Sequence, residues 1–190
     1  MKLADILLGV CRISDSAVEK MLSIADEVSF RRGSVIIDSQ TVDRNVYFVK
    51  RGLVRAYVDA VGREVTFWFG EEGAVVVSME SYVNGLPGYE TVEAIEDTEL
   101  YRIRKSGLES LYGEDIEIAN WGRKFAEKDI LRAEKCLIPH LYTTATERYA
   151  DFVSRHGTLL NRLPLEYVAS YLGITPVSLS RIRGRLVSRR

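Results

Sequence analysis

Arginine residues are concentrated near the C-terminal end of the sequence, where guanidinium groups could bind phosphates and base edges. Residues 161–190 contain six arginines and one glutamate, net +5, whereas residues 1–160 contain the other 20 basic and 26 acidic residues, net −6. Binding to nucleic acid requires local rather than global positive charge. The total of −1 is therefore the sum of a basic end and an acidic body. A solvated basic tail is the alternative interpretation.

The basic segment has the spacing of a helix-turn-helix, LEYVASYLGITPVSLSRIRG, over residues 165–184. Such a unit needs a small residue at its fifth position and a residue that tolerates positive φ at its ninth, and these are Ala169 and Gly173. Apolar residues fill the positions that pack the two helices together, which are Val168, Leu172, Ile174, Leu179 and Ile182. The pattern predicts two packed helices, of which the second enters the major groove of DNA.

Thr175 and Pro176 predict the start of the second helix, because Thr caps free amides and Pro lacks only an N–H that the first turn does not use. We expect Arg181 to read guanine, and Ser180 with two further arginines to bind phosphates. Val177 offers only contact with a thymine methyl, which leaves open an interaction protein whose helix-turn-helix does not bind DNA. The predicted DNA-binding residues are Thr175, Val177, Ser178, Ser180, Arg181, Arg183 and Arg185.

The elements that must position this unit are predicted from periodicity. Residues 28–104 form short apolar and β-branched runs separated by glycines, which predicts antiparallel strands in a sandwich, barrel or jelly roll. We expect residues 1–27 to be helical, with Ser14 as a cap. Further helices are expected at residues 106–112, 115–137 and 146–156, the last with the capping-box spacing of Thr144 and Glu147.

The long helix at 115–137 carries apolar residues that could pack on the β region or pair with a second copy. Pairing is favoured, because a helix-turn-helix that reads a palindrome works as a two-fold dimer. The predicted dimerisation residues are Ile118, Trp121, Phe125, Ile130 and Leu137.

Composition narrows the class of protein. No run approaches the roughly 20 apolar residues of a membrane span, and the N-terminus lacks the long apolar core and cleavage site of a secretory signal. Cys11 and Cys136 are isolated, which favours reduced thiols over a disulfide framework. We therefore expect a cytoplasmic protein that does not contact a membrane.

The order of these parts resembles the Crp/Fnr family of bacterial transcription regulators. The resemblance rests on YFVKRGLVRAYV and GREVTFWFG in the β region, on TERYADFV, and on the helix-turn-helix. It implies an α+β fold with a β-roll effector domain of the jelly-roll, cyclic-nucleotide-binding type at 1–114, a dimerisation helix at 115–137 and a DNA-binding domain at 138–190.

The function implied by the resemblance is transcription regulation by a homodimer that reads a palindrome in double-stranded DNA. RNA polymerase is a further candidate partner, although no residue marks a surface for it. The sequence ends at Arg190, directly after the second helix, so we expect the hairpin wing of the family to be shortened or missing.

The resemblance also identifies where an effector would bind. Family members that bind cyclic nucleotides use a Glu for the ribose hydroxyl and an Arg about ten residues later for the phosphate. Glu80 fits the first position, but no Lys or Arg lies between Glu80 and Tyr101. A buried phosphate needs a countercharge, so cyclic AMP is not expected, and another small molecule or no effector remain open. The candidate pocket residues are Ser78, Met79, Glu80, Ser81, Tyr89, Glu90 and Thr91.

Other cofactors and catalysis are disfavoured by counting ligands. An iron–sulfur cluster needs four thiolates and the sequence has two cysteines. His140 and His156 lie outside the β region, which disfavours both haem and the metal site of a cupin enzyme. The sequence also lacks a Walker A loop, a nucleophile elbow and a dinucleotide-binding glycine motif. We therefore expect no metal site and no enzymatic activity.

Overall fold

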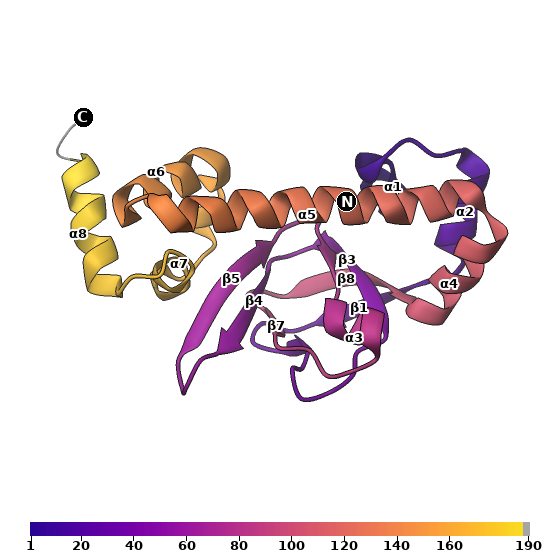
Figure 1. The fold of residues 1–190 in the computed structure, drawn as a ribbon, viewed down its shortest axis with the longest axis horizontal. Coiled ribbons are helices and arrows are strands. Elements are labelled where there is room, and N and C mark those ends of the chain that lie inside the picture. The colour runs from indigo at the N-terminus through magenta and orange to yellow at the C-terminus, as the bar shows by residue number, and fades with distance from the viewer. Residues whose placement is uncertain (188–190) are drawn as a thin grey trace. The chain divides into compact units, whose positions relative to one another are not determined.

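A computed structural model describes residues 1–187 (Figure 1). The helices are α1 (Leu3–Val10), α2 (Asp15–Ser23), α3 (Met79–Asn84), α4 (Lys105–Glu114), α5 (Ile116–Tyr142), α6 (Ala145–His156), α7 (Leu165–Tyr171) and α8 (Pro176–Val187), with a 3-10 turn at Leu159–Asn161. The strands are β1 (Ala25–Phe30), β2 (Val35–Ile37), β3 (Asn45–Arg51), β4 (Val54–Asp59), β5 (Glu64–Gly70), β6 (Val75–Val76), β7 (Thr91–Ala94) and β8 (Thr98–Arg104). Among the helices of residues 1–187, none combines the length and the apolar content that a membrane span requires.

The strands form two four-stranded sheets with the orders β1–β8–β3–β6 and β2–β7–β4–β5. Neighbours distant in sequence pair antiparallel, as in β3 with β8, where Val46 lies opposite Ile103. Gly52, between β3 and β4, has φ +114°, and a Cβ there would lie 2.5 Å from the Thr98 hydroxyl oxygen. Only glycine fits such a turn. The α+β fold with a β-roll predicted from the sequence is confirmed.

The N-terminal segment differs from its prediction. The helix predicted to start after Ser14 and reach residue 27 is shorter, because α2 ends at Ser23 and β1 already begins at Ala25. Ser14 caps α2 as expected, accepting a hydrogen bond from the amide of Ala17 at 3.3 Å. The helical pattern fails after Ser23 because β1 pairs with β8, where Arg102 also forms an ion pair with Asp26 at 3.1 Å. Pairing with a strand far along the chain outweighs local propensity.

The core of the roll lies where α1 and α2 pack with the first turns of α5. Trp121 is 2% exposed, and its indole N–H donates to the carbonyl of Leu7 at 2.9 Å. Ile118 is also fully buried in this cluster. The prediction that Ile118 and Trp121 form a dimer interface is therefore corrected, because both are already buried within their own chain. Phe125, which stacks on Trp121 with ring centroids 5.9 Å apart, packs against the same cluster.

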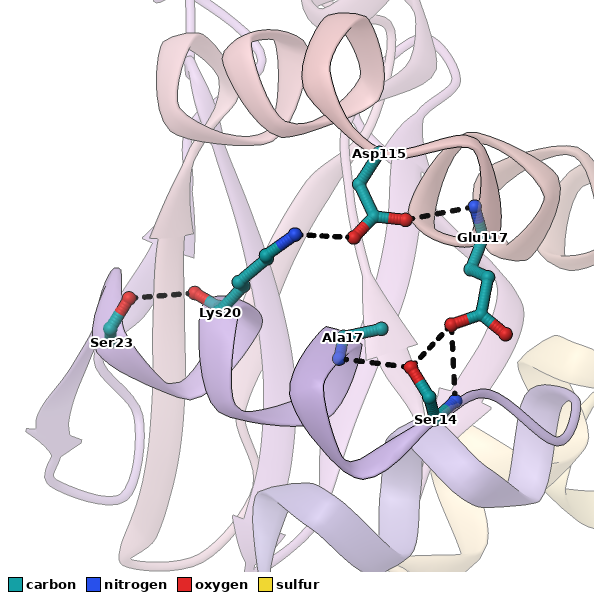
Figure 2. Close-up of polar contacts among 6 residues, drawn as sticks. All are labelled: Ser14, Ala17, Lys20, Ser23, Asp115 and Glu117. Atoms are coloured by element: carbon teal, nitrogen blue, oxygen red, sulfur yellow. Dashed lines mark hydrogen bonds and ion pairs between the residues drawn. The ribbon is translucent and has the colours of Figure 1, made fainter.

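Polar contacts fix α2 to the beginning of α5 (Figure 2). The ammonium group of Lys20 donates to Asp115 at 2.7 Å, and Asp115 also accepts from the backbone N–H of Glu117 at 2.9 Å. The Glu117 carboxylate accepts from both the hydroxyl and the backbone N–H of Ser14. The start of α5 is thus held by side chains from the N-terminal helices.

The helix α5 extends to Tyr142, beyond the predicted end at Leu137. Pro139, which follows that predicted end, lies inside the helix. The carbonyl of Pro139 accepts a hydrogen bond from the backbone N–H of Thr143 at 2.9 Å, just after the end of α5. The helix therefore continues through the proline for one more turn.

The chain divides into two compact units. The first contains residues 1–56 and 69–132, and the second contains residues 57–68 and 133–190. The outer part of the β4–β5 hairpin thus groups with the C-terminal helices, a grouping that the division of the sequence into 1–114, 115–137 and 138–190 did not anticipate.

Candidate functional site

The helices α7 and α8 form the helix-turn-helix at the predicted residues. Gly173 has φ +69°, and after it the amide of Ile174 donates to the carbonyl of Ala169 at 3.0 Å. This left-handed turn satisfies a carbonyl at the end of α7 and redirects the chain into α8. The packing residues are buried as the spacing requires, with Ile174 half-buried; they are Val168, Ala169, Leu172, Leu179 and Ile182.

The first turn of α8 is capped by Thr175. Its hydroxyl accepts from the backbone N–H of Ser178 at 3.2 Å and lies 3.0 Å from the Ser178 hydroxyl. Both residues were predicted to contact DNA. In the structure the Thr175 hydroxyl caps the amide of Ser178, so Thr175 fixes the position at which α8 begins.

The remaining predicted DNA-binding residues form the exposed side of α8. Val177 is 61% exposed, and Ser180, Arg181, Arg183 and Arg185 are exposed as well. Within residues 1–187, none of these three arginines has an ion pair with an acidic side chain. A basic helical face with unneutralised guanidinium groups is suited to contact with phosphates and guanine.

Arg148 positions the turn and was missed by sequence reasoning. Its guanidinium donates to the carbonyl of Leu172 at 3.0 Å and to the carbonyl of Thr143 at 2.6 Å. It therefore ties the C-terminal end of α7 to the residues before α6. In the sequence, Arg148 sits on an amphipathic helix among other charged residues, so no local signal distinguishes it.

A capping box starts α6, as predicted. Thr144 and Glu147 exchange hydrogen bonds, with the Glu147 carboxylate accepting from the Thr144 backbone N–H at 2.7 Å. That backbone bond, followed by the bond from the Thr144 hydroxyl, lowers the pKa of Glu147 below its ordinary value.

Ser170 on α7 makes a second contact that the sequence did not indicate. Its hydroxyl donates to the carbonyl of Glu64 and accepts from the amide of Thr66, both at 2.9 Å. Both partners belong to the segment 57–68 that groups with the C-terminal helices. The helix-turn-helix is thus hydrogen-bonded to a β-strand edge.

The candidate effector residues are only partly brought together. Ser78 is fully buried, Glu90 is 5% exposed, and the Ser78 hydroxyl and one Glu90 carboxylate oxygen lack a hydrogen-bond partner within residues 1–187. They approach the same point, because a Cβ on Gly88 would collide with the Ser78 hydroxyl and lie 3.1 Å from each Glu90 oxygen. Beside Gly88, the roll therefore presents the carboxyl group of Glu90 and not a cation that could neutralise a phosphate.

The other candidate effector residues have different roles. Met79 and Tyr89 are exposed. Glu80 accepts from the side-chain amide of Asn84 at 2.9 Å, and the buried Ser81 hydroxyl donates to the carbonyl of Leu86 at 2.8 Å. Thr91 donates to the hydroxyl of Ser39 at 3.2 Å.

A buried arginine of the roll was also missed by sequence reasoning. Arg55 on β4 is 2% exposed and forms an ion pair with Glu93 on β7 at 2.5 Å. It lies outside the interval from Glu80 to Tyr101, where the family resemblance places the phosphate-binding cation. Because Glu93 already neutralises it, Arg55 is not a free countercharge for a phosphate.

Comparison with known proteins agrees with this architecture. Residues 27–115 match the family described as cyclic nucleotide-binding domain. FixK2 from Bradyrhizobium japonicum is 26% identical with a TM-score of 0.73, covering 87% of this chain and 86% of that one. The catabolite activator protein of Thermus thermophilus is 19% identical with a TM-score of 0.61, covering 97% and 87%. A regulator assigned to the Crp/Fnr family from Eubacterium rectale is 16% identical with a TM-score of 0.70, covering 93% and 85%. The fold is that of the Crp/Fnr regulators.

The matched domain covers only part of this Crp/Fnr fold. It includes α3 and the Ser78–Glu90 region but ends at Asp115, before α5 and the helix-turn-helix. The similarity of the C-terminal part to these regulators therefore rests on the solved structures and on the geometry of α7 and α8. No curated protein matches the sequence.

Proposed function

We propose that this protein is a homodimeric transcription regulator that binds double-stranded DNA through α8. The observation that carries the proposal is the geometry of the helix-turn-helix, in which a capped helix follows a left-handed turn at Gly173 and exposes Arg181 and Arg183. The apolar side of α8 is buried, so the basic side is the one available to a groove.

The second half of α5 supplies the proposed dimer contact. At about 100° per residue, Ile118, Trp121 and Phe125 lie on one side of the helix and are packed within the roll. An exposed apolar stripe lies on roughly the opposite side of the helix. We define the apolar stripe as Ile130, Leu131, Leu137, Ile138, Leu141 and Tyr142, all exposed.

Two copies that pair along the apolar stripe would remove it from water, and the roughly seven-residue repeat is typical of paired helices. The corrected interface thus keeps Ile130 and Leu137 of the sequence prediction. Phe125 lies at the edge of the buried cluster. In this dimer, two α8 helices would lie about one turn of DNA apart, near 34 Å. We propose that the state of the roll sets the geometry of the α5 pair, and with it the spacing of the two α8 helices.

The deciding experiment is selection of genomic DNA. The ligand-free protein is incubated with sheared DNA from its source at near-physiological salt, and the bound fragments are sequenced. Wild type is compared with a variant in which Arg181 and Arg183 become Ala, and with a control in which Arg31 and Arg32, exposed on the roll, become Ala.

An enriched palindrome that survives the Arg31/Arg32 change and disappears with the Arg181/Arg183 change supports the proposal. Equal loss in both variants would reveal attraction by charge alone. Absence of enrichment with the wild type, with and without small-molecule extracts, would favour an interaction protein that does not read DNA.

We further propose that cyclic AMP is not the effector. A cyclic phosphate placed near Glu90 would meet a carboxylate and no free guanidinium, because Arg55 is paired with Glu93. Calorimetric titration should therefore show no saturable micromolar binding of cyclic AMP or cyclic GMP. Saturable binding at that level would refute this part of the proposal.

A further inference from the structure

A polar pocket of about 450 Å³ opens on the roll, at the place where the chain enters β3 and leaves β8 for α4. Ser81 is the one candidate effector residue that lines it, and the buried site formed by Ser78, Gly88 and Glu90 is not part of it. We call it the basic pocket, and the side chains that give it this character are Arg44, Arg104 and Lys105.

The backbone holds these three cations next to one another. Lys105 donates its backbone N–H to the carbonyl of Arg44 at 2.8 Å, and Arg104 lies opposite Asn45 in the β3–β8 ladder. The cations therefore share one end of an antiparallel pair of strands.

Little in the protein neutralises this cluster. Glu109 is the one acidic residue among those that line the pocket, and it lies 3.4 Å from the ammonium group of Lys105. Lys105 also donates to the carbonyl of Tyr82. The guanidinium groups of Arg44 and Arg104 have no ion pair or hydrogen bond with any other part of residues 1–187.

We propose that the basic pocket binds a small anion of the diphosphate class. A guanidinium group matches two phosphate oxygens at once, and two unpaired guanidinium groups beside an ammonium group suit a ligand with more than one phosphoryl group. The hydroxyl of Ser106, at the start of α4, adds a neutral donor to the wall. A concave site favours a small anion over a flat acidic protein surface.

The test uses the full-length protein without DNA and inorganic pyrophosphate as the probe, titrated by calorimetry at fixed ionic strength. The variant Arg44→Gln with Arg104→Gln removes both free guanidinium groups. The control Arg31→Gln with Arg32→Gln makes the same change of net charge at exposed positions outside the pocket. A second titration with a nucleoside diphosphate distinguishes inorganic from organic diphosphates, since only the organic ligand can fill the rest of the pocket.

We expect saturable binding with one site per chain, weakened at least tenfold by the Arg44/Arg104 change and less than twofold by the control. Tighter binding of the nucleoside diphosphate than of pyrophosphate assigns the pocket to an organic ligand, and equal or weaker binding assigns it to the inorganic one. Absence of saturable binding at millimolar pyrophosphate, or equal weakening in both variants, overturns the proposal. These readouts are independent of DNA binding, so the two proposals can fail separately.

Discussion

At the scale of single residues, charge and hydrogen bonding determine which side chains are available to a partner. Arg181 is exposed without an acidic partner within residues 1–187, whereas the buried Arg55 is neutralised by Glu93. Two arginines of one chain thus have opposite roles, one directed to solvent and one to the interior of the roll.

Replacing Arg181 with Ala should weaken binding to the selected palindrome by about 1–3 kcal/mol and relax the preference at one base pair. The reason is the loss of a bidentate contact with guanine O6 and N7. Fluorescence anisotropy against single-substitution operators measures both effects. A loss of equal size on every sequence would instead identify Arg181 as a phosphate contact.

Lys20 and Asp115 form the ion pair at the start of α5 (Figure 2). The hydrogen bond from Lys20 is the main cause that lowers the pKa of Asp115 below its ordinary value. An aspartate with a lowered pKa in the folded state stabilises the protein above its unfolded pKa of about 3.9, and this contribution is lost as pH falls through the folded pKa.

In Lys20→Met, the pKa of Asp115 should therefore rise toward its ordinary value, as followed by NMR titration of the carboxyl carbon. The stability difference between wild type and variant should be largest at neutral pH and vanish in acid. Lys135→Met, at an exposed position on α5, is the control and should leave the pKa of Asp115 unchanged. A stability difference that stays constant from pH 7 to pH 3 contradicts this account.

At the scale of elements, helix ends are set by local chemistry and strand ends by distant pairing. Thr144 caps α6 and Thr175 caps α8. In each case the threonine hydroxyl accepts a hydrogen bond from the backbone N–H of the residue three positions later. The strand β1, by contrast, exists because β8 lies beside it. Local caps could be predicted from adjacent residues, whereas the start of β1 could not.

Replacing Thr144 with Ala should destabilise the protein by about 1 kcal/mol, because the capping box then leaves an amide of the first turn unsatisfied. Denaturant unfolding with a probe in the C-terminal helices measures the change. Thr158→Ala is the matched control, since Thr158 precedes the 3-10 turn without a side-chain cap. The control should change stability by less than roughly 0.5 kcal/mol. Equal effects in the two variants would show that the cap contributes nothing particular.

At the scale of the whole molecule, α5 has two apolar faces that belong to different contacts. The face with Trp121 is covered by the roll of its own chain, and the apolar stripe is exposed in a single copy. Ile130 and Leu137 are 62% and 63% exposed, which is unusual for two large aliphatic side chains on one face of one helix. A second copy is the occupant that the proposed regulator requires.

Replacing Ile130 and Leu137 with Gln should raise the dimer dissociation constant at least tenfold, since burial of each such side chain contributes about 1.5–3 kcal/mol. Analytical ultracentrifugation measures this constant, and affinity for the palindrome should fall with it. Arg132→Gln, on the opposite side of the helix, is the control. A dimer that is unaffected by the double change would place the interface elsewhere.

Local features of the fold could be predicted from the amino-acid sequence alone. The spacing of Ala169, Gly173 and Leu179 predicted the helix-turn-helix, since each position depends on residues within one turn. Glycines and period-two runs predicted antiparallel strands in a sandwich, barrel or jelly roll, and Ser14 and Thr144 predicted helix caps. These predictions hold because backbone geometry and capping are decided by neighbours in the chain.

Which apolar and charged side chains contact one another depends on tertiary folding. It buried Trp121 against α1, paired Arg55 with Glu93, and placed Arg148 under the turn of the helix-turn-helix. It also brought Arg44 and Arg104 to one pocket from segments about sixty residues apart. Helical periodicity assigns residues to a face but does not say what covers that face, because burial depends on elements that only folding brings together.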